Sequence, residues 1–191
     1  NFYGTSAAAP HAGAATALIL EARKRHYNGE ILNGSQVRTL LQSTAVDMDA
    51  PGYDPATGYG FIQTDKALLT FANPIPQVVN MGLQDSAFIP GTDPVTVVIN
   101  GEYFSNNASV VFQYDTIPAQ VTNGNQIIAV IPPFVGNPPL TVYNPPLANS
   151  GTDGGISDSL YFFGNIPQNV KVYVNNASKR FGEKIPPYSF N

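Results

Sequence analysis

The hydrophobic pattern of the first 72 residues predicts helices. Residues 7–26 are rich in Ala, Leu and Ile and are apolar on nearly every face until a basic cluster near the end. This pattern predicts a long helix that is buried on all sides and ends at solvent. A second helix is predicted over 35–42, with Ser35 as its N-cap. After a loop over 47–60, a short third helix is predicted over 64–71.

From residue 77 onward the pattern changes to short alternating segments separated by Pro, Gly and Asn. Strands are predicted over 95–99, 102–104, 109–112, 119–122, 126–131, 140–143, 159–163 and 170–174. Asn100-Gly101 is a strong turn signal and predicts a hairpin turn after the first of them. Several short strands with regular turn signals are typical of a small β-sandwich. The Pro-rich segment 73–76 between the two patterns predicts a domain boundary.

The charge of the chain is low and unevenly placed. Charged residues make up 12% of the sequence and the formal net charge is -4. Lys and Arg are missing between Lys66 and Lys171, whereas Asp and Glu continue through that stretch. Such a segment repels phosphate backbones, so we expect no nucleic-acid partner.

Two further absences in the sequence limit its class. No apolar run is long enough to span a bilayer, so no membrane span is expected. Cysteine is absent, which excludes disulfides and thiolate zinc sites. Low charge together with abundant Asn, Thr, Gly and Pro is typical of extracellular β-modules, and a secreted or cell-surface bacterial protein fits this composition.

Ser6 is the candidate nucleophile. It lies among small residues where a loop meets a helix, in the run Gly4-Thr5-Ser6-Ala7-Ala8-Ala9-Pro10-His11. A nucleophile is presented there with little steric cover, and N–H groups at the helix start can stabilise an oxyanion. Pro10 is tolerated near a helix start, which puts that start close to Thr5-Ser6. Either residue could instead be a simple N-cap, which is the alternative for Ser6.

The two histidines are not expected to activate Ser6. A serine nucleophile needs a histidine base within hydrogen-bond reach. On one helix His11 is rotated by about 140° from Ser6, so the two side chains cannot face each other. We therefore assign His11 to packing. His26 lies at the solvent end of the same helix and is expected to interact with the helix dipole.

The run from Gly4 to His11 strongly resembles the active-site serine motif of the subtilisin-like serine proteases (peptidase S8, subtilase family), Gly-Thr-Ser-(Met/Ala)-Ala-x-Pro-His. Residues 40–45, LLQSTA, resemble the family's LL-x-x-TA helix end. Residues 58–68 resemble its closing GYG segment. The three motifs occur in the family's order and cover residues 1–72. The resemblance implies the C-terminal helical portion of an α/β subtilisin-like domain, truncated at the start.

Two departures from the family pattern concern local packing only. Gln63 stands where the family usually has Asp or Asn. The chain has Ala12-Gly13-Ala14 where the family more often has Val-Ala-Gly, so the small residue that allows close helix packing is shifted by one position.

The resemblance also implies an activity. In subtilisins the triad runs Asp, His, Ser along the chain. Ser6 would then be the nucleophile of a serine endopeptidase that cleaves proteins or peptides through an acyl-enzyme. Its His and Asp partners would lie upstream of Asn1, so the fragment itself is expected to be inactive.

Calcium is the cofactor that the resemblance allows, and no cofactor is certain. Three carboxylates, those of Asp47, Asp49 and Asp54, share one loop. Pro51 interrupts the EF-hand spacing, and no bidentate Glu follows at the right place. A solvated loop is therefore the favoured interpretation of this segment.

The second half of the chain resembles two β-modules. Residues 77–164 resemble the immunoglobulin-like IPT/TIG module, and residues 165–191 resemble the start of an MBG-type β-repeat, truncated at its end. The aromatic residues of this half could form a ligand platform, but alternation places most of them in a core. They are Tyr103, Phe104, Phe112, Tyr114, Phe134, Tyr143, Tyr161, Phe162 and Phe163.

Two functions remain open. One is a secreted or surface-displayed serine endopeptidase with an Ig-like extension. The other is a non-catalytic surface adhesin or scaffold of Ig-like modules, whose protease-like segment has lost its triad. The sequence does not fix the oligomeric state. An exposed apolar surface is expected around Ala14, Leu18 and Ile19, because the sheet that such a helix packs against is missing.

Overall fold

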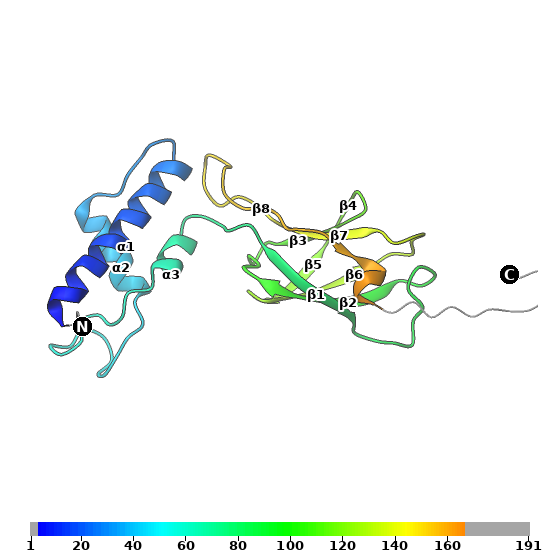
Figure 1. Ribbon diagram of the computed structural model, residues 1–191, viewed down its shortest axis with the longest axis horizontal. Coiled ribbons are helices and arrows are strands. Elements are labelled where there is room, and N and C mark those ends of the chain that lie inside the picture. The colour runs from blue at the N-terminus through cyan, green and yellow to red at the C-terminus, as the bar shows by residue number, and fades with distance from the viewer. Residues whose placement is uncertain (1–3, 167–191) are drawn as a thin grey trace, which may run out of the picture.

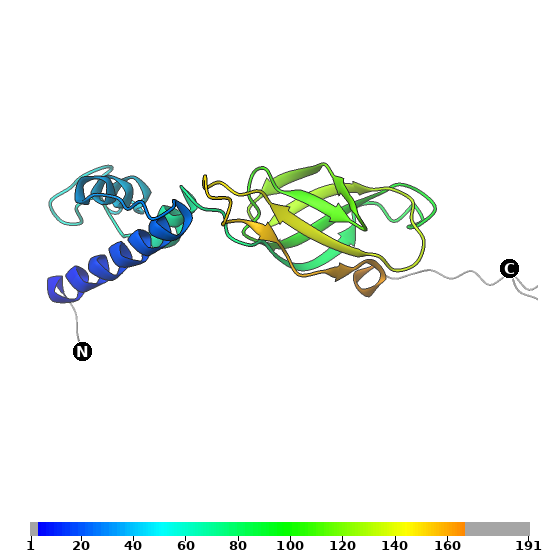
Figure 2. The same cartoon turned by 90° about the horizontal axis from the view of Figure 1, so that it is seen from above.

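Helices α1 to α3 precede the strands along the chain in the computed structural model, which describes residues 4–166 (Figure 1). The helical part (residues 4–72) contains α1 (Thr5–His26), α2 (Gly34–Thr44) and α3 (Thr64–Leu69). The β part (residues 77–166) lies end to end with it, as Figure 2 also shows. The predicted strand over 170–174 and nearly all of the MBG-like segment are outside the described residues.

None of the helices found within residues 4–166 combines the length and apolar character that a membrane crossing needs.

Helix α2 begins one residue before the predicted start, and its N-cap is Asn33. The Asn33 side chain accepts a hydrogen bond from the Gln36 N–H at 3.0 Å, and the Gln36 side chain accepts one from the Asn33 N–H at 2.9 Å. This reciprocal capping box satisfies two N–H groups at once, which a cap at Ser35 would not. The prediction of Ser35 as the N-cap is therefore wrong.

Helix α1 is covered on one side only. Ala15 and Ile19 are its buried residues, and Ile19 packs with Ala67 and Phe71 near α3. Leu18 is 60% exposed. Burial on all sides is therefore not seen within the described residues, because the contacts of α1 with α3 cover one face only. An exposed apolar surface at Leu18 is as expected, whereas Ile19 is buried and does not belong to it.

The β part consists of two antiparallel sheets. The first has the strand order β1-β2-β6-β5, and the second has β4-β3-β7-β8, with β9 also paired to β7. The strands are β1 (Gln77–Leu83), β2 (Val95–Glu102), β3 (Ser109–Phe112), β4 (Asp115–Ile117), β5 (Ala119–Asn123), β6 (Gln126–Ile131), β7 (Pro139–Asn144), β8 (Gly155–Ile156) and β9 (Leu160–Tyr161). A short helix, α4 (Phe162–Asn165), follows β9.

One shared hydrophobic core lies between the two sheets. Strand β2 alternates buried and partly exposed positions along its length, as expected for a strand with one face in a core. Phe112, Phe134 and Phe162 stack edge to face, with ring centroids 4.6 to 5.9 Å apart. Tyr114 and Tyr161 are exposed. The prediction of an aromatic core thus holds for these phenylalanines and fails for these tyrosines, whose hydroxyl groups favour contact with water.

The predicted turn at Asn100-Gly101 is wrong, because β2 runs through both residues to Glu102. A Cβ atom at Gly101 would collide with the carbonyl oxygen of Gln77 on β1, so glycine here permits a close approach of two strands. The chain turns at Tyr103, whose φ of 63° is in the left-handed region. The predicted strand over 102–104 is therefore wrong as well.

The predicted strand over 159–163 is correct only in part. Strand β9 ends at Tyr161, and α4 begins at Phe162. The Phe162 ring reaches the core from this helical turn.

Candidate functional site

Ser6 is the second residue of α1 and is exposed. Gly4 is the N-cap, at a φ of 80° that favours glycine, and no side chain caps this helix. Neither Thr5 nor Ser6 is the N-cap, so the simple capping interpretation of Ser6 is wrong. The side chain of Ser6 remains available at the helix start.

The backbone at this helix start is suited to bind an anion. The first N–H groups that donate back to the chain are those of Ala7 and Ala8, which donate to the Gly4 carbonyl oxygen at 3.0 and 3.1 Å. The Ser6 N–H has no backbone acceptor within residues 4–166. A helix N-terminus with such N–H groups stabilises negative charge, including an oxyanion that forms at the serine.

Neither histidine of the chain lies where it could activate Ser6. His11 is exposed on the same continuous helix, and its ring centroid is 6.2 Å from that of Phe61. His26 lies about 30 Å from Ser6 along α1, at the 1.5 Å rise per residue of a helix. Its Nδ1 atom lies 2.9 Å from the Thr152 hydroxyl oxygen. The described residues thus place an exposed serine and free N–H groups at this helix start, with neither histidine in reach of that serine.

The loop between α2 and α3 returns beside the N-terminal half of α1. Val46 and Phe61 form a β-bridge at its base, with N–H to O distances of 2.9 and 2.8 Å. Gly60, at a φ of 104°, passes so close to Val46 that a Cβ atom would collide with the Val46 carbonyl. This closure brings Phe61 next to His11.

Carboxylates inside this loop bind backbone donors. Asp54 accepts hydrogen bonds from the N–H groups of Ala56 and Thr57 and from the Thr57 hydroxyl. The Thr57 hydroxyl, and next the Thr57 N–H, hold the pKa of Asp54 below its ordinary value against the opposing effect of burial. Asp47 accepts the Gly52 N–H at 2.7 Å.

This loop does not fit a calcium site. A Ca²⁺ ion needs six to eight oxygen ligands. No group of three or more His, Asp or Glu side chains that could hold a metal occurs in the described part of the chain. Both carboxylate oxygens of Asp54 and the Oδ2 atom of Asp47 already accept hydrogen bonds from N–H or hydroxyl donors.

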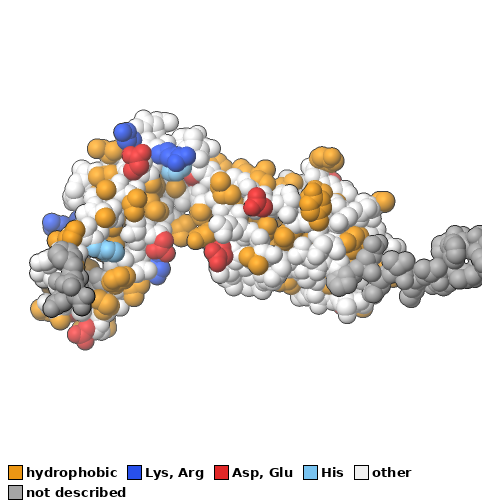
Figure 3. Space-filling model, viewed as in Figure 1, with side chains coloured by type: hydrophobic (Ala, Val, Ile, Leu, Met, Phe, Trp, Pro, Cys, Tyr) orange, Lys and Arg blue, Asp and Glu red, His pale blue; other side chains and the backbone are white. Residues whose placement is uncertain are grey.

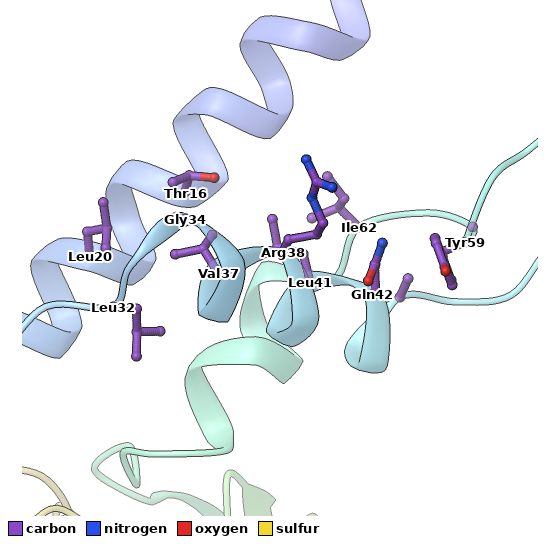
Figure 4. Close-up of a pocket in the computed structure, with 12 residues that line it drawn as sticks. Thr16, Leu20, Leu32, Gly34, Val37, Arg38, Leu41, Gln42, Tyr59 and Ile62 are labelled. Carbon is purple, nitrogen blue, oxygen red and sulfur yellow. The ribbon is translucent and has the colours of Figure 1, made fainter. Parts of the chain in front are cut away.

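An apolar groove of about 440 Å³ lies between α1, α2 and the end of this loop (Figure 4). Leu20, Leu41 and Ile62 are among the side chains that line it, and Arg38 is its one charged lining residue. Hydrophobic side chains are also spread over the surface of the helical part in Figure 3. The lining contains no His, Asp, Glu, Lys or Ser side chain, so the groove offers an apolar surface without an acid–base pair.

Comparison with known proteins supports the interpretation of the helical part. Residues 1–60 match the model of the subtilase family, Peptidase_S8. Fervidolysin from Fervidobacterium pennivorans is 39% identical over 67 residues, which cover 35% of this chain and 9% of fervidolysin. The similarity supports a subtilisin-like serine protease segment. The matched region spans less than a tenth of the length of this relative, and the family match ends before the β part begins.

Two polar residues that the sequence analysis did not single out are buried at the junction of the two parts. Asn144 is completely buried, and Asp153 is 7% exposed. Asn144 follows Leu140 and Val142 at the inward positions of β7. Asn144 continues the alternation of the inward-facing positions 140 and 142, and this alternation could have predicted that its amide is buried. Asp153 lies in the glycine-rich run Gly151-Thr152-Asp153-Gly154-Gly155, which predicts only a turn.

Proposed function

We propose that this chain is the C-terminal part of a subtilisin-like serine endopeptidase, followed by an IPT/TIG-like immunoglobulin module and the start of an MBG-type repeat. The observation that carries the proposal is Ser6 itself. It is exposed at a helix start, beside an N–H group without an acceptor in the described residues, and it lies inside the segment that matches the subtilase family. A serine that served only as a cap would have a capping bond, and α1 has none.

In the proposed reaction Ser6 attacks the carbonyl carbon of a peptide bond. A histidine accepts the proton from Ser6 Oγ and then donates it to the leaving amine, and an aspartate orients that histidine. The Ser6 N–H and an upstream side-chain amide stabilise the oxyanion of the tetrahedral intermediate. Water then hydrolyses the acyl-enzyme at Ser6. The histidine and aspartate are proposed to lie upstream of Asn1, because His11 and His26 do not reach Ser6.

The substrates proposed are proteins or peptides, and the location proposed is outside a bacterial cell. Low charge, the absence of cysteine and the β-module extension support that location. Residues 1–191 alone are proposed to be inactive. No calcium site in the loop over 47–54 belongs to the proposal, since the carboxylates there bind backbone donors.

Labelling with a fluorophosphonate probe tests this function. The probe reacts with an activated serine, so the protein that contains this chain behind its upstream region should be labelled. The Ser6→Ala variant should lose the label. Ser35→Ala is the matched control, because Ser35 is an exposed residue in the first turn of α2, and it should be labelled like the wild type. Equal labelling of Ser6→Ala would refute the role of Ser6, and no labelling of the wild type would favour the non-catalytic scaffold.

A further inference from the structure

The segment that joins the helical part to the β part is held by the connection between β7 and β8, which we call the junction loop (residues 144–155, including the last residue of β7 and the first of β8). Asp153 in this loop accepts the backbone N–H of Asn73 at 2.7 Å. The same carboxylate accepts the N–H groups of Leu147 and Ala148, at 2.8 and 3.0 Å. One buried side chain therefore shapes the junction loop and binds the connecting segment at the same time.

Asn73 is bound through its backbone N–H, its carbonyl oxygen and its side-chain NH₂ group. Besides the N–H that it donates to Asp153, its side-chain amide donates to the Pro145 carbonyl oxygen at 2.8 Å. Its own carbonyl oxygen accepts the Gly154 N–H at 2.6 Å. Gly154 has a φ of 69°, and a Cβ atom there would lie 2.5 Å from the Asn144 carbonyl oxygen, so the loop needs glycine to approach this closely.

Asn144 provides a second attachment, to the next residue of the connecting segment. Its side-chain amide donates to the carbonyl oxygens of Pro74 and Tyr103, at 2.9 and 2.7 Å. Its side-chain oxygen accepts the Ser105 N–H at 3.0 Å. Because Asn144 ends β7 and is completely buried, the connecting segment is tied directly to the core of the β part.

The junction loop also contacts the helical part. The Thr152 hydroxyl oxygen lies 2.9 Å from His26 Nδ1, at the C-terminal end of α1. Figure 1 shows the loop before β8 extending toward that end of α1. Hydrogen bonds thus join the two parts at the connecting segment and again at His26.

We propose that the junction loop is a joint that fixes the helical part and the β part as one rigid body. A Pro-rich connection alone leaves two domains free to reorient, but buried hydrogen bonds to charged and amide groups oppose that motion. The joint lies at the end of α1 opposite Ser6, about 30 Å away along the helix. The β part is therefore a rigid spacer that points away from the nucleophile, and it does not line a cleft around Ser6. This inference stands whether or not Ser6 is catalytic.

Distance measurement between two spin labels tests the joint in the chain of residues 1–191. The sequence has no cysteine, so Lys24→Cys on α1 and Gln120→Cys on β5 give two labels at exposed positions. Pulsed electron paramagnetic resonance should give one narrow distance distribution. In Asp153→Asn an amide NH₂ group would face backbone N–H donors, so the narrow peak should be lost. Asp158→Asn is the matched control, because Asp158 is exposed, and it should keep the peak.

A broad distribution in the otherwise unaltered chain would overturn the proposal, and so would a narrow peak in a folded Asp153→Asn. Far-ultraviolet circular dichroism shows whether that variant is folded. If it is not, Asn73→Gly decides, since Asn73 lies outside the two sheets. That variant removes the bond to Pro145 and frees the backbone, so the narrow peak should be lost there too; its retention would overturn the proposal.

Discussion

The substitution Asn144→Ala should strongly destabilise the β part, because it removes a buried side chain that forms several hydrogen bonds. The Asn144 side chain makes three hydrogen bonds, to the Ser105 N–H and to the carbonyl oxygens of Pro74 and Tyr103. It is completely buried, so water does not replace it easily. Each bond contributes about 1 kcal/mol net, and a buried group left without a partner costs about 1–3 kcal/mol.

We therefore expect the free energy of unfolding to fall by about 3 kcal/mol, which is the sum for the three hydrogen bonds without any added cost for the partners left unpaired. This is a large share of the 5–15 kcal/mol by which a typical domain is stable. Asn100→Ala is the matched control. Asn100 also bonds to two side chains, those of Asn80 and Gln126, but on the outer face of its sheet, so its loss should cost under about 1 kcal/mol.

Urea unfolding of both variants, followed by far-ultraviolet circular dichroism, measures these differences. The chain has no tryptophan, so tryptophan fluorescence cannot follow its unfolding. Circular dichroism is suitable because it reports the β structure directly. If Asn144→Ala unfolds within about 0.5 kcal/mol of the wild type, or at the same denaturant concentration as Asn100→Ala, the buried amide does not hold the junction as argued.

Three further predictions concern stability. Phe162→Ala should cost about 3–5 kcal/mol in urea unfolding, because its buried ring packs on Phe112 and Phe134, whereas exposed Tyr161→Ala should cost little. Burial raises the pKa of Asp153, but the N–H donors outweigh it and hold that pKa below its ordinary value of 3.8. The ionised Asp153 therefore contributes fully to stability above pH 3.8, and this contribution is lost as the pH falls through its lower pKa in the folded state. The difference in unfolding free energy between wild type and Asp153→Asn should shrink only in that acid range. A difference that shrinks near neutral pH would contradict this. Calorimetry should show a sharp transition for residues 77–166 and none for residues 1–72, whose small core has three buried residues; a sharp transition for 1–72 would refute it.

The sequence predicted the regular elements well where periodicity dominates. Helix α1 and strands β2, β3 and β6 lie close to their expected positions, because long apolar runs and alternation leave few other ways to bury those side chains. The two-residue strands β8 and β9 were harder to place, since their pairing to β7 depends on the fold as a whole.

The errors came from residues whose role depends on tertiary contacts. Gly101 is a turn signal by composition, but in the structure it lets β2 pass close to Gln77. Asn33 and Ser35 are both good caps, and only the Gln36 side chain decides between them. From the sequence Asp153 is expected only in a polar loop, because its hydrogen bond from the N–H of Asn73, 80 residues away, depends on the folded structure.

One residue of the candidate site, Ser6, was predictable from the sequence. Ser6 was found from the local run of small residues, and its exposed position at a helix start follows from that run. The assignment of Gly4 as the N-cap was not predictable, because it depends on a backbone φ of 80°.

Mapping of a fluorophosphonate adduct by mass spectrometry tests the central claim most directly. The protein that carries this chain behind its upstream region is treated with the probe and digested, and the modified residue is identified. Activation of Ser6 by a histidine and aspartate predicts a single adduct on Ser6 Oγ. An adduct on another serine, or an unmodified Ser6 in a protein that cleaves peptides, would contradict the account.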